Sequence, residues 1–180
     1  MKLVKMLGVA AMIAASSTSQ AAPAAVAPAS SKVITVGHVK AVTDLLAAMQ
    51  VEKKMRTIAA TSKYANEAQR AAVFAKLEKI PKEQIYARLA YPLAKSISAE
   101  TANEMARFYN TPHGKQVVFG MYNSRGGLQG LGMGGQQKPT AAEKKELTRP
   151  EYVKAKQELD AADSAISEAA FILLRAISKT

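Results

Sequence analysis

The stretch Thr148–Ile177, TRPEYVKAKQELDAADSAISEAAFILLRAI, indicates the fold class of this chain. An apolar residue recurs at every third or fourth position, which is the spacing that places side chains on one face of an α-helix. Thr148 and Glu151 have the spacing of a capping box, so we predict one long helix from there almost to the C-terminus. Its apolar stripe consists of Tyr152, Ala155, Leu159, Ala162, Ile166, Ala169, Leu173 and Ile177.

Segments nearer the N-terminus carry the same spacing. We predict a helix over 39–58 and another over 66–79, where alanines form most of the stripe and Val73 and Leu77 lie beside it. The second helix should end before Pro81, because the residue before a proline is pushed out of helical geometry. The two stripes are Val39, Val42, Leu46, Met49, Met55 and Ile58, and then Ala68, Ala71, Ala72 and Ala75.

The next segment, 81–97, has Pro81 in its first turn, and Pro92 inside it should kink or divide the helix. Ser98 then caps the following helix, with Glu100 in its first turn. A capping box of Thr140 with Glu143 predicts a short helix before the final one. The four-residue spacing in 81–97 is carried by Ile85, Leu89, Leu93 and Ile97.

Fold class follows from these patterns. No useful length of the chain alternates apolar and polar residues as a half-buried strand does. We therefore predict an all-α protein, a single helical bundle-like domain of about six to seven helices. The domain would begin near residue 34, and helices over 140–180 would pack on the helical part at 34–123.

A short corner, Phe108–Lys115, separates two of the predicted helices. One helix ends at Phe108 and Tyr109, Thr111 caps the next, and Pro112 begins it, so that it runs to near Tyr122. Gly114 offers no side chain to obstruct the close approach of another element. A structural role explains these residues, and a ligand groove at the corner is the alternative. The corner residues singled out are Phe108, Tyr109, Thr111, Pro112, Gly114 and Lys115.

The N-terminal segment predicts export. Lys2 and Lys5 precede an apolar run of about ten residues, and small residues at Ser19 and Ala21 suit signal peptidase, so residues 1–21 are expected to be cleaved after Ala21. The run is shorter than the roughly 20 residues of a membrane-spanning helix. A buried N-terminal helix is the alternative. The protein would then be periplasmic or secreted, with 22–33 as a disordered Ala/Pro linker.

Residues 124–139 are predicted to be a flexible glycine-rich crossover loop, since six of the ten glycines of the chain lie between 126 and 135. Gly130, Gly132 and Gly135 satisfy the G-x-G-x-x-G pattern. A dinucleotide site would also need a preceding strand and a following helix. The preceding segment is helical, so the pattern predicts no cofactor.

The string Ile97–Val117, ISAETANEMARFYNTPHGKQV, resembles the segment that marks a group of exported bacterial proteins, domain-of-unknown-function family 2059. The likeness lies in a serine-acid helix start followed by Phe-Tyr-x-Thr-Pro-x-Gly-Lys at Phe108–Lys115. The predicted helix over Val39–Met55 is similar to the family's opening helix, although Met49-Gln50-Val51 departs from the Thr-Gly-Ala of many members. The resemblance covers Val39–Tyr122 and implies a helical periplasmic protein without an established activity.

The sequence contains no recognisable catalytic or metal-binding pattern. His38 and His113 belong to different predicted elements, neither has an evident orienting acid, and we expect His113 to be solvated. Glu100 and Glu104, four residues apart, are expected to be solvated charges rather than a catalytic pair. The chain has no cysteine, which excludes disulfides and zinc-thiolate sites. We predict a protein that is not an enzyme, with no catalytic residue, cofactor or metal.

The charge leaves two classes of function open. The chain carries +11 at pH 7, and +9 once Lys2 and Lys5 leave with the signal, since 11 − 2 = 9. One class is a non-catalytic interaction or adaptor module of the envelope, which holds a peptide or partner protein in a groove between helices. The other is a basic binder of anionic lipid or cell-wall polymer. An uncharacterised enzyme is the least favoured alternative.

The positions of the charges favour the first class. Basic residues gather around the start of the last helices, but four acids are interleaved with them, as on an ordinary solvated face. We expect no nucleic-acid partner, because no stacking aromatics accompany the lysines, and no transmembrane helix. The basic residues are Lys138, Lys144, Lys145, Arg149, Lys154 and Lys156, and the acids are Glu143, Glu146, Glu151 and Glu158.

Overall fold

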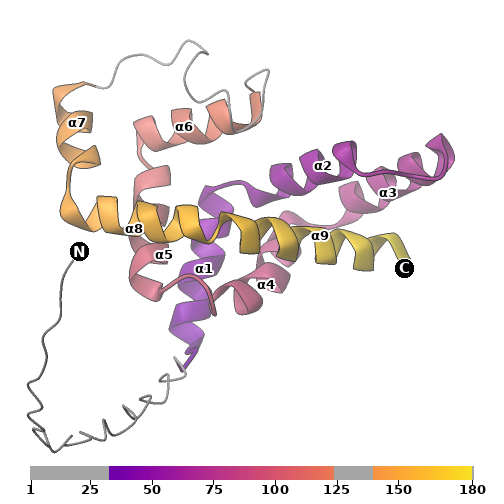
Figure 1. Ribbon diagram of the computed structural model, residues 1–180, viewed down its shortest axis with the longest axis horizontal. Coiled ribbons are helices and arrows are strands. Elements are labelled where there is room, and N and C mark those ends of the chain that lie inside the picture. Colours follow the sequence, from indigo (N-terminus) through magenta and orange to yellow (C-terminus); the bar gives the residue numbers. More distant parts are fainter. Residues whose placement is uncertain (1–32, 124–139, 180) are drawn as a thin grey trace, which may run out of the picture. The chain divides into compact units, whose positions relative to one another are not determined.

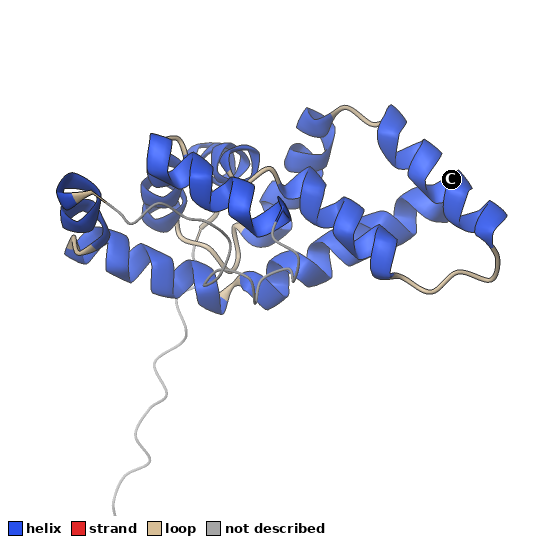
Figure 2. Cartoon of the chain, turned by 90° about the horizontal axis from the view of Figure 1, so that it is seen from above, coloured by secondary structure: helices blue, strands red, loops and turns tan. Residues whose placement is uncertain are grey.

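The computed structural model describes residues 33–123 and 140–179, and every element in these two ranges is a helix (Figure 1, Figure 2). The all-α prediction is confirmed. The predicted signal peptide, most of the predicted linker and the glycine-rich segment lie outside the described residues. The helices are α1 (Val36–Ala48), α2 (Val51–Thr61), α3 (Glu67–Lys79), α4 (Lys82–Leu93), α5 (Ala99–Tyr109), α6 (Pro112–Asn123), α7 (Ala141–Leu147), α8 (Pro150–Ala161) and α9 (Asp163–Lys179).

The described part of the chain holds nine helices, more than predicted, because two of the predicted helices are each divided. The first division is at Gln50, whose φ of 53° lies in the left-handed region. A non-glycine residue there costs about 1–2 kcal/mol. Met49 and Val51, the residues on either side of Gln50, are both buried, and their burial offsets that cost. The apolar spacing in the sequence carries no sign of this turn.

The second division, at Ala162, separates α8 from α9, which follow one another along the chain in Figure 1. The Ala162 N–H donates to the carbonyl oxygens of Glu158 at 3.0 Å and Leu159 at 3.1 Å. Beyond this turn Ile166 and Ile177 are buried as predicted. Ala170 and Leu174 are buried in place of their predicted neighbours, Ala169 and Leu173, which are only partly buried. The reason is that α9 packs against α2, α3 and α4, so that its buried face is wider than a single stripe.

Two predicted helix starts are wrong. Pro150 is the first residue of α8, since its fixed φ suits that position, and Arg149 is therefore the N-cap instead of Thr148. The Thr148 hydroxyl closes α7 instead, donating to the Lys144 and Lys145 carbonyls at 3.1 Å and 3.0 Å. Likewise Pro81 lies just before α4 rather than in its first turn. The capping box of Thr140 and Glu143 is confirmed at the start of α7.

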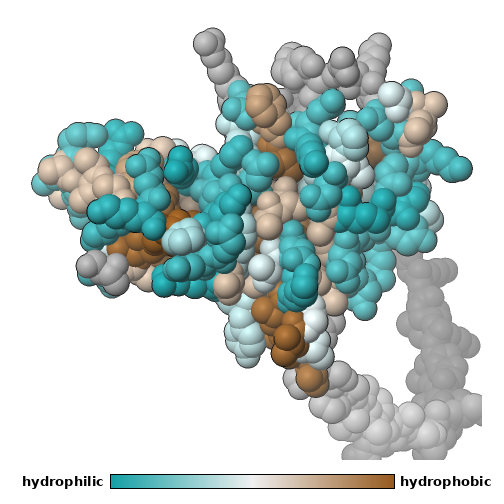
Figure 3. Space-filling view, turned by 180° about the vertical axis from the view of Figure 1, so that it is seen from behind, coloured by the Kyte–Doolittle hydropathy of each residue, from teal (hydrophilic) through white to brown (hydrophobic). Residues whose placement is uncertain are grey.

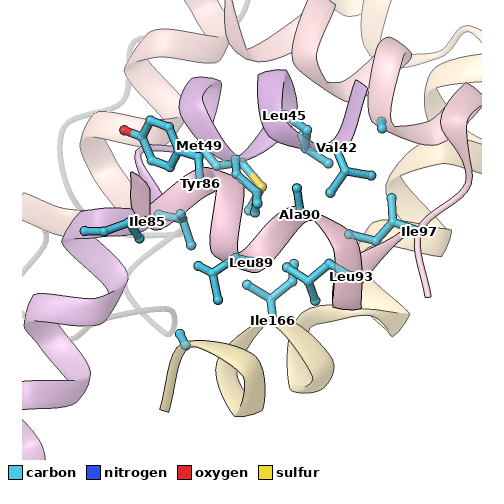
Figure 4. Packing of buried hydrophobic residues seen from close by; sticks show 14 of the residues in the cluster. Val42, Leu45, Met49, Ile85, Tyr86, Leu89, Ala90, Leu93, Ile97 and Ile166 are labelled. Carbon is cyan, nitrogen blue, oxygen red and sulfur yellow. The ribbon is translucent and has the colours of Figure 1, made fainter. Parts of the chain in front are cut away.

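One part of the core packs around α4, which lies between α1 and α9 (Figure 4). The four residues predicted from the four-residue spacing, Ile85, Leu89, Leu93 and Ile97, are all buried. Pro92 lies within the last turn of α4, which ends one residue later, as expected of a proline that removes a hydrogen-bond donor. Helix α5 packs against α1 and α8, and thereby joins the C-terminal helices to the core.

The predicted apolar face of α3 is wrong. Its alanines are exposed, whereas Val73 and Leu77 are buried and face α2 and α9. Larger side chains bury more apolar area on packing, so they determine which face turns inward. Alanine is stable on an exposed helix surface because of its high helix propensity. The exposed alanines are Ala68, Ala71, Ala72 and Ala75.

Apolar surface gathers around the start of α1 (Figure 3), where Val33 and Val36 are almost fully exposed. Tyr91 of α4 is also exposed, and it lines a shallow groove there with Ile34 and Val39. No helix in 33–123 or 140–179 is long and apolar enough to cross a membrane.

Candidate functional site

Side-chain and backbone contacts hold the predicted corner in place between α5 and α6. The Thr111 hydroxyl accepts a hydrogen bond from the Gly114 N–H at 3.0 Å and donates one to the Phe108 carbonyl at 2.7 Å. Pro112 begins α6, and both Pro112 and Lys115 are exposed. A Cβ on Gly114 would lie 2.0 Å from the Phe108 carbonyl oxygen, so only glycine allows the two helices to approach this closely.

The ring of Phe108 is the centre of an aromatic group that spans three helices. Its centroid lies 4.7 Å from that of Tyr152 on α8, 5.4 Å from that of Tyr109, and 6.1 Å from the ring of His113 on α6. Tilted and edge-on pairs at these distances are favourable. Phe108 thus contacts α6 through His113 and α8 through Tyr152.

Beside this aromatic group is a cavity of about 560 Å³. Residues of α2, α5, α6, α7, α8 and α9 form its wall, together with Met49. Most of the lining is apolar or aromatic, as in pockets that bind small molecules. The lining residues are Met49, Lys54, Thr57, Ile58, Phe108, Tyr109, His113, Val117, Met121, Tyr122, Leu147, Tyr152, Lys156, Leu159, Asp160, Asp163 and Ile166.

Two ion pairs compensate the charges in the wall. Lys54 Nζ on α2 lies 2.5 Å from Asp163 Oδ1 at the start of α9, and the Lys54 side chain is largely buried. Lys156 Nζ lies 2.6 Å from Asp160 Oδ2 one turn along α8, where both side chains are largely exposed. Each basic group among these four residues therefore has an acidic partner, and the four formal charges sum to zero.

Three tyrosines contribute hydroxyl groups to the wall. The Tyr122 hydroxyl donates to the Met49 carbonyl oxygen at 3.0 Å. Tyr109 and Tyr152 are each only 6% exposed, and no residue in the described ranges forms a hydrogen bond with either hydroxyl. Burial raises the pKa of all three tyrosines, so each hydroxyl stays protonated at neutral pH.

A cluster of ion pairs holds α7 beside the cavity. Arg107 on α5 binds Glu104 on the same helix at 2.8 Å and also Glu146 on α7. Arg149 pairs with Glu104, and its Nε lies 3.2 Å from Glu146 Oε2, although not along a hydrogen-bond direction. The expectation that Glu104 is solvated is wrong, because its side chain is only 16% exposed. The hydrogen bond from Arg107 is the largest effect that lowers the pKa of Glu104.

The two histidines have different positions. The side chain of His113 is only 13% exposed and lies at the cavity, so the expectation that it is solvated is wrong. Glu143 is the acidic neighbour that the sequence did not reveal, with Oε1 3.7 Å from His113 Nδ1. That carboxylate already accepts the Thr140 N–H in the capping box. His38 is buried, and its Nε2 lies 2.7 Å from the Ile97 carbonyl oxygen. This contact joins α1 to the segment between α4 and α5.

Glu158 is not one of the solvated acids expected from the sequence among the basic residues of the last helices. Its carboxylate accepts hydrogen bonds from the Ser98 N–H at 2.6 Å, the Ser98 hydroxyl at 3.0 Å and the Thr101 hydroxyl at 2.7 Å. Ser98 also caps α5 as predicted, with its hydroxyl accepting from the Thr101 N–H. An acid at a helix N-terminus is favourable, so Glu158 attaches α8 to the start of α5.

The sequence pointed to only part of this site. Phe108 and Tyr109 of the predicted corner line the cavity, whereas Thr111, Gly114 and Lys115 do not. Tyr122, Tyr152 and Lys54 were missed as site residues, because they come from separate helices and no local pattern connects them. In the described ranges, no group of three His, Cys, Asp or Glu residues could hold a metal ion.

No protein-family model, curated protein or solved structure matches the chain. The resemblance of Ile97–Val117 to domain-of-unknown-function family 2059 therefore stays a prediction from the sequence.

Proposed function

We propose that this chain is a non-catalytic binding protein that holds an apolar group in the cavity between the α5–α6 corner and α8. The observation that supports this most is the cavity itself, about 560 Å³ with a wall that is mainly apolar and aromatic. Cavities of this size and composition suit ligands that bury most of their surface. The proposal adds a specific candidate site to the interaction module expected from the sequence.

The polar groups in the wall support binding more than catalysis. The three tyrosine hydroxyls stay protonated, so none provides a phenolate nucleophile at neutral pH. The 3.7 Å between His113 and Glu143 exceeds a hydrogen bond, and Glu143 is engaged at the start of α7. Among the lining residues in the part of the chain that the structure describes, no serine lies beside His113, and the chain has no cysteine.

The arrangement of charges supports the cavity over a basic surface as the main site. Lys144 and Lys145 are exposed, but Arg149 and Lys156, from the same basic group, have acidic partners. Exposed ion pairs contribute little energy and weaken the attraction of an anionic surface. We place the protein in the envelope because of its N-terminal sequence. A mature N-terminus at Ala22 would support this location, and an intact Met1 would contradict it.

The proposal is tested by filling the cavity. Val117 on α6 lines it and is only partly buried, so Val117→Trp should occupy the space without opening the core. Titration with the neutral fluorescent dye N-phenyl-1-naphthylamine should show binding to the wild type and at least tenfold weaker binding to this variant. The matched control is Gln116→Trp, an exposed neighbour that does not line the cavity.

The control variant should bind the dye as the wild type does, and circular dichroism should show that both variants fold. Absence of dye binding to the wild type, or equal affinity in Val117→Trp and Gln116→Trp, would overturn the proposal.

A further inference from the structure

We infer that the ligand of this cavity is a neutral amphiphile, a mainly apolar molecule with one hydroxyl or carbonyl oxygen that hydrogen-bonds with Tyr109 and Tyr152. This inference rests on the proposed function and goes further, since it states the charge and the polar group of the ligand. It depends on two unpaired hydroxyl groups, on the compensated charges of the wall and on the size of the cavity.

The first observation concerns the hydroxyl groups. A buried hydroxyl without a partner is unfavourable, and nearly all such groups in folded proteins are paired. Two other tyrosines obey this rule: the buried Tyr86 donates to Glu52 at 2.6 Å, and the partly buried Tyr122 donates to the Met49 carbonyl. Tyr109 and Tyr152 have no such partner within the described ranges. Each residue is 94% buried (100 − 6 = 94), and the hydroxyl oxygens keep some accessible surface beside the cavity that both residues line.

Tyr109 and Tyr152 both line the cavity, as do Tyr122, Asp160 and Asp163. A protonated tyrosine can both donate and accept a hydrogen bond, so a hydroxyl or carbonyl oxygen of a ligand in the cavity can supply the partner that these hydroxyls lack.

The second observation concerns charge. The two lysines of the wall already pair with Asp163 and Asp160, and His113 lies beside Glu143. A carboxylate or phosphate on the ligand would lie close to two aspartates, and no lysine or arginine that lines the cavity within 33–123 or 140–179 is left without an acidic partner. An ammonium group would have to displace a lysine from its partner. Burial of an uncompensated charge is strongly unfavourable, whereas a neutral oxygen avoids it.

The third observation is size. At about 560 Å³ the cavity exceeds the volume of a single side chain and falls in the range of small-molecule sites. Met49 and Met121 lie in its wall, and methionines adapt well to flexible apolar chains. A medium-chain alcohol such as 1-decanol therefore serves as the probe.

The test uses isothermal titration at pH 7 to compare three probes of equal chain length: 1-decanol, decanoate and decylammonium. The alcohol is kept below its solubility limit and the two ions below their micelle concentrations. We expect 1-decanol to bind at least tenfold more tightly than either ion. Tyr109→Phe and Tyr152→Phe should each lower the affinity for 1-decanol by about two- to tenfold, which corresponds to the loss of one net hydrogen bond. Tyr86→Phe, which removes a paired hydroxyl away from the cavity, is the control and should leave 1-decanol binding unchanged.

The dye titration separates the two claims. Removal of an unpaired hydroxyl should not destabilise the fold, so circular dichroism should show Tyr109→Phe and Tyr152→Phe folded as the wild type is. If the dye binds the wild type, either of two results would overturn this inference alone. One is equal affinity for decanoate and 1-decanol, and the other is unchanged 1-decanol binding in both Tyr109→Phe and Tyr152→Phe. Failure of the dye to bind the wild type would overturn the proposed function and this inference together.

Discussion

Gly114 is the residue on which the corner depends most directly. A Cβ there would lie 2.0 Å from the Phe108 carbonyl oxygen and 2.6 Å from Tyr109 Cα. Both are backbone atoms, so no change of rotamer could relieve the contact, and α5 and α6 would have to separate. Since Phe108 and Tyr109 line the cavity, this movement would also alter its wall.

Gly114→Ala should therefore lower the free energy of unfolding by about 3 kcal/mol, the upper part of the range for overpacking. Urea denaturation measures this value. The control is Gly37→Ala in α1, where the nearest atom to an added Cβ is Thr35 Oγ1 at 3.8 Å. That change should raise stability by up to about 1 kcal/mol through helix propensity. Equal stability of Gly114→Ala and the wild type would contradict the close packing of this corner.

At the residue scale, the sequence predicted contacts that are local. Ser98 and Thr140 cap their helices as expected, because each cap involves residues three positions apart. The partners of Glu158 and His113 could not be predicted in this way. Glu158 binds Ser98 from 60 residues away, and the acid beside His113 belongs to another helix. Such pairs depend on how helices pack, which spacing along one helix does not encode.

At the scale of elements, α7 is attached mainly by polar contacts. None of its residues is fully buried, and only Leu147 packs partly against the core. Glu146 binds Arg107 on α5, and Arg107 in turn binds Glu104. The wall that α7 contributes to the cavity should therefore be sensitive to the charge of these carboxylates.

Glu104→Gln should lower the free energy of unfolding at pH 7 by about 1–2 kcal/mol, because two arginines lose a charged partner. The hydrogen bond from Arg107 contributes most to lowering the pKa of Glu104 in the folded protein. A lowered folded pKa stabilises the protein above the unfolded pKa of about 4.3, and this stabilisation is lost as the pH falls through the folded pKa. The difference between wild type and variant should therefore be complete at pH 7 and shrink in acid.

Urea denaturation at a series of pH values measures this difference, and hydrogen exchange of the α7 amides reports whether α7 opens first. Glu78→Gln, an exposed acid of α3, is the control and should change little at any pH. A pH-independent difference for Glu104→Gln would show that packing rather than charge is responsible.

Element boundaries were predicted where a residue enforces them. Pro92 lies one residue before the end of α4, and Pro112 begins α6 as expected. Gln50 and Ala162 carry no such signal, since the apolar spacing continues through both. The chain turns at Gln50 because burial of its neighbours outweighs a strained backbone angle, which is a tertiary effect.

At the scale of the whole molecule, the all-α class was predictable, whereas the cavity was not. Its wall joins residues from Met49 to Ile166, and its charges are compensated across helices, as in the pair of Lys54 with Asp163. The sequence singled out Phe108 and Tyr109 only as members of a corner. Their role in a cavity depends on α2 and α8, which lie far from them along the chain.

The most direct test of the central claim, that this cavity binds an apolar ligand, is methyl NMR of protein labelled at its methionines. Met49 and Met121 line the cavity, whereas Met55 and Met105 are fully buried elsewhere in the core. On titration with 1-decanol, the methyl signals of Met49 and Met121 should shift and saturate, while those of Met55 and Met105 stay in place. Unmoved signals from Met49 and Met121, or equal shifts at all four methionines, would contradict the claim.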